Sequence, residues 1–211
     1  MPDLNNARNW YPQADLVHGF EHVERVYRMA ERLAVQEGAD LEIVRAAALL
    51  HDAIGSLTNT DIPRTGHQHA SAQFARQVLL EEGWPDARIT QVEHCIRSHR
   101  FRDEQEQPHT LEAQILFDAD KLDAIGAIGV ARAIGYSVQH GHPAYSDISA
   151  GFIETGCLEP GEWHSSYHEF IFKLRHIKDR LYTFSARSIG DERHRYTEEF
   201  FSRLKAEAGG E

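Results

Sequence analysis

The sequence predicts a protein made entirely of α-helices and folded as a single domain. Apolar residues recur at intervals of three and four along most of the chain, as they do on the buried stripe of a helix. No stretch alternates apolar and polar residues over the length of a strand, and no internal repeat is visible. The length of 211 residues allows one sizeable core, or at most two small ones.

The first half of the chain reads as four helices. The apolar stripe of the first helix consists of Leu16, Phe20, Val23, Val26, Ala30 and Leu33. Gly38 ends this helix, and Asp40 caps a second helix that runs to Gly55. The segment HASAQFARQVLLEEG forms a third helix closed by Gly83. Asp86 is the expected cap of a fourth helix, whose buried stripe is Ile89, Val92 and Ile96.

The second half contains the most apolar helix and an irregular segment. Thr110 caps a helix that we expect to run unbroken over 111–135, at the centre of the fold because it is apolar on most sides. Residues 135–162 are rich in Gly, His, Pro and Ser and hold no period, which is typical of a functional lid. Two amphipathic helices follow, around YHEFIFKLRHIKDRLY and RHRYTEEFFSRLKAE. The single domain of 1–211 thus divides into a core of about 15–134, a lid of about 135–162 and C-terminal helices of about 163–207.

The charge of the chain excludes one class of partner and favours another. The formal net charge is −11 and the isoelectric point about 5.7. Sequence-independent binding to a nucleic acid duplex needs a basic surface, so we expect none. An acidic protein can still bind small phosphates through local cations, either side chains or a metal. The 14 histidines favour a search for metal ligands.

The expected compartment is the cytoplasm. The cysteines, Cys95 and Cys157, are too few for a disulfide framework. No apolar run approaches the ~18 residues that span a membrane. The first residues, MPDLNNARNW, show neither the basic segment nor the apolar run of a signal peptide. We therefore expect no membrane attachment.

Four polar residues occupy positions where a packed helix would normally carry apolar ones. His51 and Asp52 end the apolar stretch AAALLHDAIG, and burying one unsatisfied polar group costs roughly 2–7 kcal/mol. His22 lies on the stripe of the first helix, and Asp120 lies inside the most apolar helix. The economical explanation is that these side chains converge on one divalent cation. Two nitrogens and two oxygens leave about two open positions on an octahedral ion, which favours Mn, Fe, Co, Ni or Mg over a closed structural zinc site.

The ordered residues resemble the HD-domain superfamily of metal-dependent phosphohydrolases. The matching stretches are HGFEHVERV, AALLHDAIG and DADKLDAIGAIGVARA, and the C-terminal EFIFKLRHIKDRLYT and DERHRYTEEF are similar to one bacterial branch of the family. The resemblance implies a helical bundle in which His22, His51, Asp52 and Asp120 bind the metal. It also implies hydrolysis of a phosphate ester or anhydride, with a nucleotide as the substrate, either a triphosphate cut to pyrophosphate or a monophosphate.

Some members of this superfamily use two further histidines to hold a second metal. His99 continues the stripe of Ile89, Val92 and Ile96, and His69 shares a stripe with Ala72, Ala75 and Leu79. Both are therefore candidate ligands of a second ion, with substrate contacts or core hydrogen bonds as the alternative. The remaining nearby histidines are expected at the surface: His67, His94 and His109.

Three residues are predicted to act in catalysis and three to bind substrate phosphates. Asp52 acts as ligand and catalytic carboxylate, Lys121 offsets phosphate charge, and Asp123 orients a water or holds Lys121. Lys173 and Arg175 join Lys121 as phosphate contacts, although their basic stretch is equally typical of a solvated helix face.

The stretch DADKLDA leaves a choice of metal-binding aspartate. Asp118 and Asp120 diverge by about 200° on a helix and cannot both face one ion. The stripe of Asp120 continues with small residues and leaves room for an ion, so Asp120 is the predicted ligand. Asp118 is expected to play a capping or supporting role.

Two other functions fit parts of the sequence. HGFEH matches the H-x-x-E-H pattern of a zinc peptidase class, with His18 and His22 as ligands and Glu21 as base. That hypothesis leaves Asp120 and the His51-Asp52 pair unexplained. A non-catalytic helical module for signalling or scaffolding is the other alternative, but such modules usually lack some of the ligands, and here all four are present.

Overall fold

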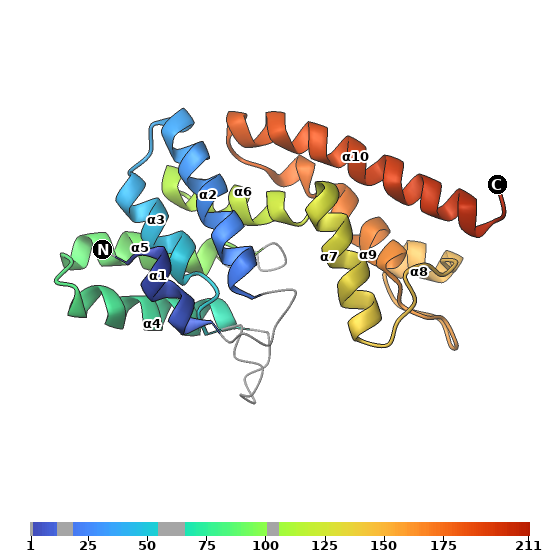
Figure 1. The fold of residues 1–211 in the computed structure, drawn as a ribbon, viewed down its shortest axis with the longest axis horizontal. Helices are drawn as coiled ribbons and strands as arrows, with labels where there is room; N and C mark the ends of the chain where they lie inside the picture. Colours follow the sequence, from blue (N-terminus) through green and yellow to red (C-terminus); the bar gives the residue numbers. More distant parts are fainter. Residues whose placement is uncertain (1, 12–18, 55–65, 101–105) are drawn as a thin grey trace. The chain divides into compact units, whose positions relative to one another are not determined.

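The computed structural model describes residues 2–11, 19–54, 66–100 and 106–211, and these ranges contain helices, turns and no strand (Figure 1). The predicted all-α fold is therefore confirmed. Backbone contacts group the chain into two compact units, residues 1–121 with 182–186 and residues 122–181 with 187–211. The arrangement of the whole chain as one domain stays a prediction, and each unit is described by itself.

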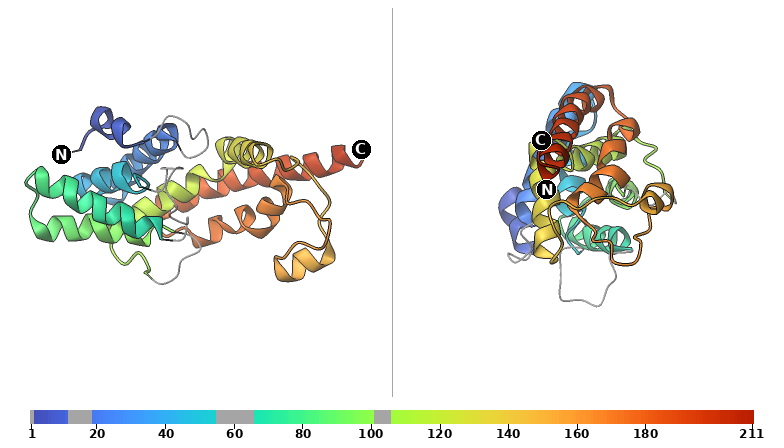
Figure 2. Two further views of the ribbon diagram at one scale, coloured as in Figure 1. Left: turned by 90° about the horizontal axis from the view of Figure 1, so that it is seen from below. Right: turned by 90° about the vertical axis from the view of Figure 1, so that its right-hand side faces the viewer.

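The first unit is built from two pairs of packed helices and a short N-terminal segment. Helix α4 lies beside α5, and α2 beside α3, which also contacts α5 (Figures 1 and 2). Its elements are α1 (Leu4–Ala7), the 3-10 turn η1 (Arg8–Trp10), α2 (Phe20–Glu37), α3 (Leu41–Leu50), α4 (His67–Glu81), α5 (Asp86–Ser98) and most of α6 (Leu111–Asp123).

The helix ends of this unit follow the predicted capping residues. Gly38 adopts φ +76° after α2, a left-handed conformation that favours glycine. The Asp40 carboxylate accepts hydrogen bonds from the backbone N–H groups of Glu42 and Ile43 and so caps α3. Leu16 of the predicted first helix lies outside the described residues. Every residue of α3 from Ala46 to Leu50 is fully buried, so this helix brings the His51-Asp52 pair to the interior.

The long helix predicted over 111–135 is wrong, because the chain breaks after Asp123. Ile125 is extended and Gly126 adopts φ +78° before α7 begins. A Cβ on Gly129 would lie 2.2 Å from the Ala124 carbonyl oxygen, so only glycine permits this close turn. The two glycines of AIGAIG therefore turn the chain, although the hydrophobic period runs through them.

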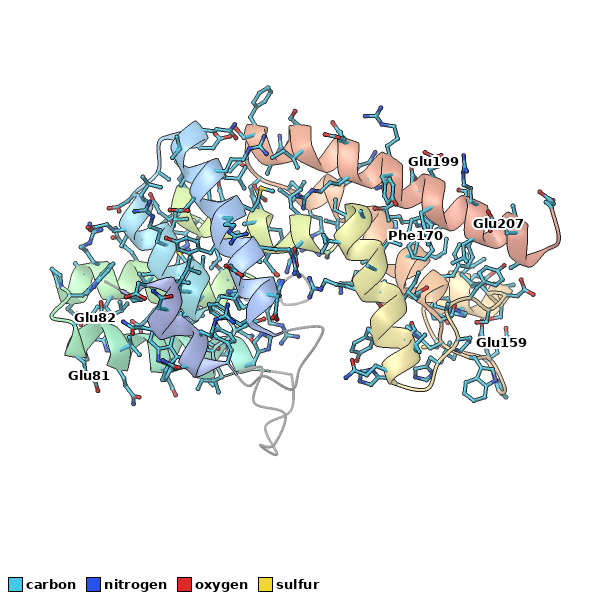
Figure 3. The ribbon with its side chains drawn as sticks, viewed as in Figure 1. Glu81, Glu82, Glu159, Phe170, Glu199 and Glu207 are labelled. Atoms are coloured by element: carbon cyan, nitrogen blue, oxygen red, sulfur yellow. The ribbon has the colours of Figure 1, made fainter. Side chains whose placement is uncertain are left out.

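The second unit contains the remaining helices. Its elements are α7 (Gly126–Gln139), α8 (Ala150–Thr155), α9 (Ser166–Phe172), the 3-10 turns η2 (Leu174–His176) and η3 (Lys178–Arg180), and α10 (Phe184–Ala208), whose first residues belong to the first unit. Phe170 of α9, which is labelled in Figure 3, stacks on Phe201 of α10, and their ring centroids are 4.6 Å apart. No described helix is both long and apolar enough to span a bilayer.

Two boundaries in this unit differ from the prediction. The amphipathic helix expected around 167–182 is divided into α9 and two 3-10 turns, because buried residues spaced by three and four, Leu174, Ile177 and Leu181, are compatible with both helix types. The irregular segment expected to start at 135 starts after Gln139 and contains α8. Glu162 fixes part of this segment, accepting hydrogen bonds from the Ser149 backbone (2.7 Å) and from the His168 ring (3.0 Å). Its action as a lid stays a prediction.

Candidate metal centre

His51 presents a free nitrogen to the interior of the first unit. Its Nδ1–H donates to the Ala48 carbonyl oxygen at 2.8 Å, which leaves the lone pair on Nε2. The side chain is fully buried, and Nε2 has no hydrogen-bond partner among the described residues. A backbone carbonyl that fixes the tautomer in this way is typical of metal-binding histidines.

Asp52 lies between two groups of candidate ligands. Its Oδ2 is 3.6 Å from His51 Nε2, whereas its Oδ1 is 3.1 Å from His67 Nε2 and 3.5 Å from His99 Nε2. The ligand atoms of His22, His51 and Asp52 all lie within 4.8 Å of one another, and so do those of Asp52, His67 and His99. Asp52 is thus shared by both groups.

Helices α2 and α6 bring His22 and Asp120 to the same place. His22 Nε2 lies 3.3 Å from Asp120 Oδ1, and the ring centroids of His22 and His51 are 5.6 Å apart. The other Asp120 oxygen accepts from Lys121 Nζ at 2.6 Å. The structure therefore gathers the four predicted ligands from α2, the end of α3 and α6.

The electrostatics of the cluster favour the protonation states that bind metals. Burial lowers the pKa of His51 to about 4, against the opposing charge of Asp52, so the ring is neutral at pH 7. Burial would raise the pKa of Asp52, but the neighbouring imidazoles of His51, His67 and His99 outweigh it and hold that pKa well below its usual range. The pKa of Asp120 is likewise well below its usual range, because Lys121 and His22 outweigh the effect of burial.

The donor set fits a divalent cation. Neutral imidazole nitrogens and ionised carboxylates are the ligands that Mn, Fe, Co and Ni accept. The unpartnered Nε2 of buried His51 is the clearest sign, because an unsatisfied buried polar atom destabilises a fold and needs an explanation.

The prediction for His69 needs correction. Its side chain is exposed, while His67, predicted at the surface, lies against Asp52 and His99. The buried residues of α4 are Gln68, Ser71, Ala72, Ala75 and Leu79. His69 lies about 100° around the helix from Gln68, beyond the edge of this stripe. His67 is the first residue of α4, directly after Gly66. The spacing of apolar residues along a helix does not show which way its first residue faces.

The sequence also assigns three other histidines to the interior or to the surface. His99 is buried, as predicted, and its Nδ1–H donates to the Ile96 carbonyl oxygen at 2.5 Å, which directs Nε2 toward Asp52. His94 is buried rather than exposed, because its ring nitrogen pairs with Glu106 at 2.7 Å. His109 is exposed, as predicted.

Lys121 and Asp123, both predicted to act in catalysis, have different ion-pair partners. Lys121 is buried and pairs with Asp120, with its ammonium 5.2 Å from the centroid of the Phe117 ring. The Asp123 carboxylate pairs with Arg132 at 2.6 Å, and its predicted part in orienting a water or holding Lys121 stays a prediction. Asp123 therefore fixes the start of the second unit.

Lys173 and Arg175 belong to the second unit. Lys173, directly after α9, pairs with Glu169 of that helix at 2.9 Å, and Arg175 Nε donates to the His176 ring at 3.1 Å. Their contact with substrate stays a prediction.

The peptidase hypothesis finds no support in the site. Glu21, its proposed base, is exposed, while the neighbouring His22 is buried beside Asp120. His18 lies outside the described residues. The described geometry instead joins His22 to the three other residues that the peptidase hypothesis leaves unexplained.

Comparison with known proteins places this site in a family. The profile of the HD domain matches residues 19–125, the part of the chain that carries all these candidate ligands. The chain belongs to the HD-domain family. Bacillus subtilis YpgQ, an uncharacterised protein, is 33% identical over 196 residues, which cover 92% of this chain and 85% of the relative.

Solved structures agree in fold over nearly the whole chain. The crystal structure of B. subtilis YpgQ in complex with ADP matches with a TM-score of 0.72 and 30% identity, covering 97% of each chain. A protein from Lactobacillus plantarum matches with a TM-score of 0.77 and 30% identity, over 99% of this chain and 95% of the other. An HD-superfamily hydrolase from Bacillus thuringiensis matches with a TM-score of 0.70 and 27% identity, over 99% and 97%.

Proposed function

We propose that the protein is a metal-dependent phosphohydrolase that cleaves a small phosphate ester or anhydride, with a nucleotide as the substrate. The observation that carries the proposal is the grouping of His22, Asp52 and His51, whose Nε2 is buried and unpartnered, with Asp120 beside His22. Similar solved structures include HD-superfamily hydrolases, which supports hydrolysis as the reaction class.

Residues of three helices would hold the cation. His22, His51, Asp52 and Asp120 are the proposed ligands, as the family resemblance implies. A divalent cation bound there supplies charge neutralisation for a phosphoryl group and lowers the pKa of water. Phosphoryl transfer requires positioning and charge stabilisation more than covalent chemistry from the protein.

The chain's own side chains have separate tasks in this proposal. Lys121 brings a positive charge beside Asp120 and can turn its ammonium toward a phosphate oxygen. The backbone carbonyls of Ala48 and Ile96 hold the rings of His51 and His99, so both keep Nε2 directed at Asp52. The burial of these rings keeps the site preorganised before substrate binds.

A similar solved structure and the cationic side chains of this chain support a nucleotide as the substrate. The YpgQ structure contains ADP, and this chain matches it over 97% of its length. The chain has no P-loop, so nucleotide phosphates would be bound by the cation and by cationic side chains such as Lys121.

The first prediction is metal-dependent hydrolysis. The purified protein should release phosphate or pyrophosphate from at least one member of a panel of nucleoside mono-, di- and triphosphates in the presence of Mn, Co, Ni or Mg. Activity should fall to background in a chelator, because the cation is the group that would neutralise phosphoryl charge and activate water, and should return when the ion is added back. Hydrolysis that persists after complete metal removal would contradict the proposal.

We also propose a second cation held by Asp52, His67 and His99. These ligand atoms lie within 4.8 Å of one another, and Asp52 would belong to both ligand sets. This replaces the earlier expectation of His69 as a ligand.

The second prediction tests this ligand set with a matched pair of variants. His67→Ala should lower the bound metal from about two equivalents per chain to about one, whereas His69→Ala should leave it unchanged because that ring is exposed. Metal content after saturation with Mn and gel filtration measures both. If His69→Ala lowers the bound metal and His67→Ala does not, His69 is the ligand, as the sequence predicts.

A further inference from the structure

The hydroxyl of Tyr11 contacts the end of the helix that carries His51 and Asp52. Tyr11 lies before the segment matched by the HD profile, which starts at residue 19. Its side chain is 4% exposed, and its hydroxyl donates to the Leu49 carbonyl oxygen at 2.8 Å.

The Leu49 carbonyl needs a hydrogen-bond donor from outside the helix because α3 ends one residue later, at Leu50. The last carbonyls of a helix lack intrahelical partners. After α3 ends at Leu50, the Ala53 N–H donates to Leu50 at 3.3 Å, which leaves the Leu49 carbonyl without that donor. The preceding carbonyl, of Ala48, accepts from the His51 ring. Side chains thus bind two consecutive carbonyls next to the His51-Asp52 turn.

The ring of Tyr11 contacts a second ligand-bearing helix. Its centroid is 5.7 Å from that of Phe20, the first residue of α2 and two residues before His22. Both rings belong to one buried cluster in the first unit, formed by Ala7, Tyr11, Phe20, Val23, Leu49 and Ala53.

The neighbouring Trp10 extends these contacts to a third helix. Its ring meets Phe74 of α4 edge-on, with centroids 5.7 Å apart. Helix α4 begins with His67. The N-terminal segment therefore contacts the helices that carry His22, His51 and His67.

We infer that Tyr11 is a positioning residue for the metal centre. Its hydroxyl and its ring together fix the position of the His51-Asp52 turn relative to His22. The inference rests on the proposed function, because it assumes that these residues bind a cation. It gives the N-terminal segment, outside the matched domain, a role in metal affinity. Groups that orient metal ligands typically change affinity by about 10–100-fold when they are removed.

The experiment compares two Tyr→Phe variants by titration calorimetry with Mn²⁺. Tyr11→Phe removes the hydroxyl bond and keeps the ring, and we expect its Kd for Mn²⁺ to rise about tenfold. Tyr182→Phe is the matched control, because its hydroxyl bonds to exposed Gln107 at 3.0 Å in the same unit. Its Kd should equal that of wild type. Phe20→Leu, which removes the ring contact, should weaken binding by a smaller factor than Tyr11→Phe.

The outcomes separate this inference from the proposed function. A wild-type protein that binds no Mn²⁺ would overturn the proposed function. Wild-type affinity in both Tyr11→Phe and Phe20→Leu would overturn only the inference and leave Tyr11 a core residue. A purely structural role would lower the unfolding temperature equally with and without Mn²⁺, whereas positioning also reduces the stabilisation that Mn²⁺ provides.

Discussion

Asp52→Asn is expected to abolish turnover and to weaken metal binding at both ligand groups by more than about a hundredfold, beyond what the loss of an orienting group costs. Asp52 is the residue shared by the two groups, with one oxygen near His51 and the other near His67 and His99. Asparagine keeps the shape but removes the negative charge and one acceptor oxygen. The imidazoles of His22, His51, His67 and His99 then lack the shared anion that a divalent cation needs.

Asp40→Asn provides the matched control for Asp52→Asn. Asp40 caps the opposite end of the same helix, and asparagine caps helices about as well as aspartate. Metal content, Mn²⁺ titration and phosphate release should all remain at wild-type values in this variant. Circular dichroism should show unchanged helix content in both. Full metal binding by Asp52→Asn, with the fold intact, would show that the cation does not bind at this turn.

The gathering of these candidate ligands could be predicted from the sequence because each residue violates a local rule. His22, His51 and Asp120 lie on apolar faces, where an isolated polar group is unfavourable. A polar residue at a buried helical position requires a partner, even when its identity is unknown. This reasoning depends only on the period of the helix and works best in the middle of regular elements.

The same reasoning failed where a helix begins or breaks. His67 opens α4, so no preceding turn shows which way it faces. Gly126 and Gly129 turn the chain inside an apolar run, and periodicity alone does not distinguish a glycine in a helix from one at a break.

Contacts between segments that are distant along the chain could not be predicted from the sequence either. The Tyr11 hydroxyl meets Leu49 across 38 positions of the chain. The pairing of Asp123 with Arg132, on the far side of the helix break, is another contact that the sequence did not predict. Such partners follow from tertiary packing, which a hydrophobic period does not specify.

Asp118 and Asp120 have different partners, and this difference supports Asp120 as the residue that binds the cation. The Asp118 carboxylate is fully buried and accepts from the backbone N–H groups of Tyr182 (2.9 Å) and Thr183 (2.8 Å) and from the Thr183 hydroxyl (2.7 Å). It therefore fixes the residues that precede α10. Asp120 instead lies beside His22 and Lys121.

Exchanging each aspartate for asparagine should consequently affect two different properties. Asp118→Asn replaces one acceptor oxygen by an amide donor that faces the N–H group of either residue 182 or residue 183, and hydrogen bonds to a charged group contribute roughly 1.5–3 kcal/mol each. We expect the free energy of unfolding to fall by about 3 kcal/mol, measured in urea, with the Kd for Mn²⁺ almost unchanged in the folded protein.

Asp120→Asn should show the opposite pattern. It removes the charge that the cation and Lys121 share, so Mn²⁺ affinity should fall by more than about a hundredfold and turnover by nearly all of its wild-type value, a larger effect than loss of an orienting group. Its unfolding free energy without metal should change less than that of Asp118→Asn, because Asp120 accepts no backbone hydrogen bond among the described contacts. If Asp118→Asn abolishes Mn²⁺ binding while Asp120→Asn binds normally, the cation lies on the other face of α6 and the assignment of Asp120 is wrong.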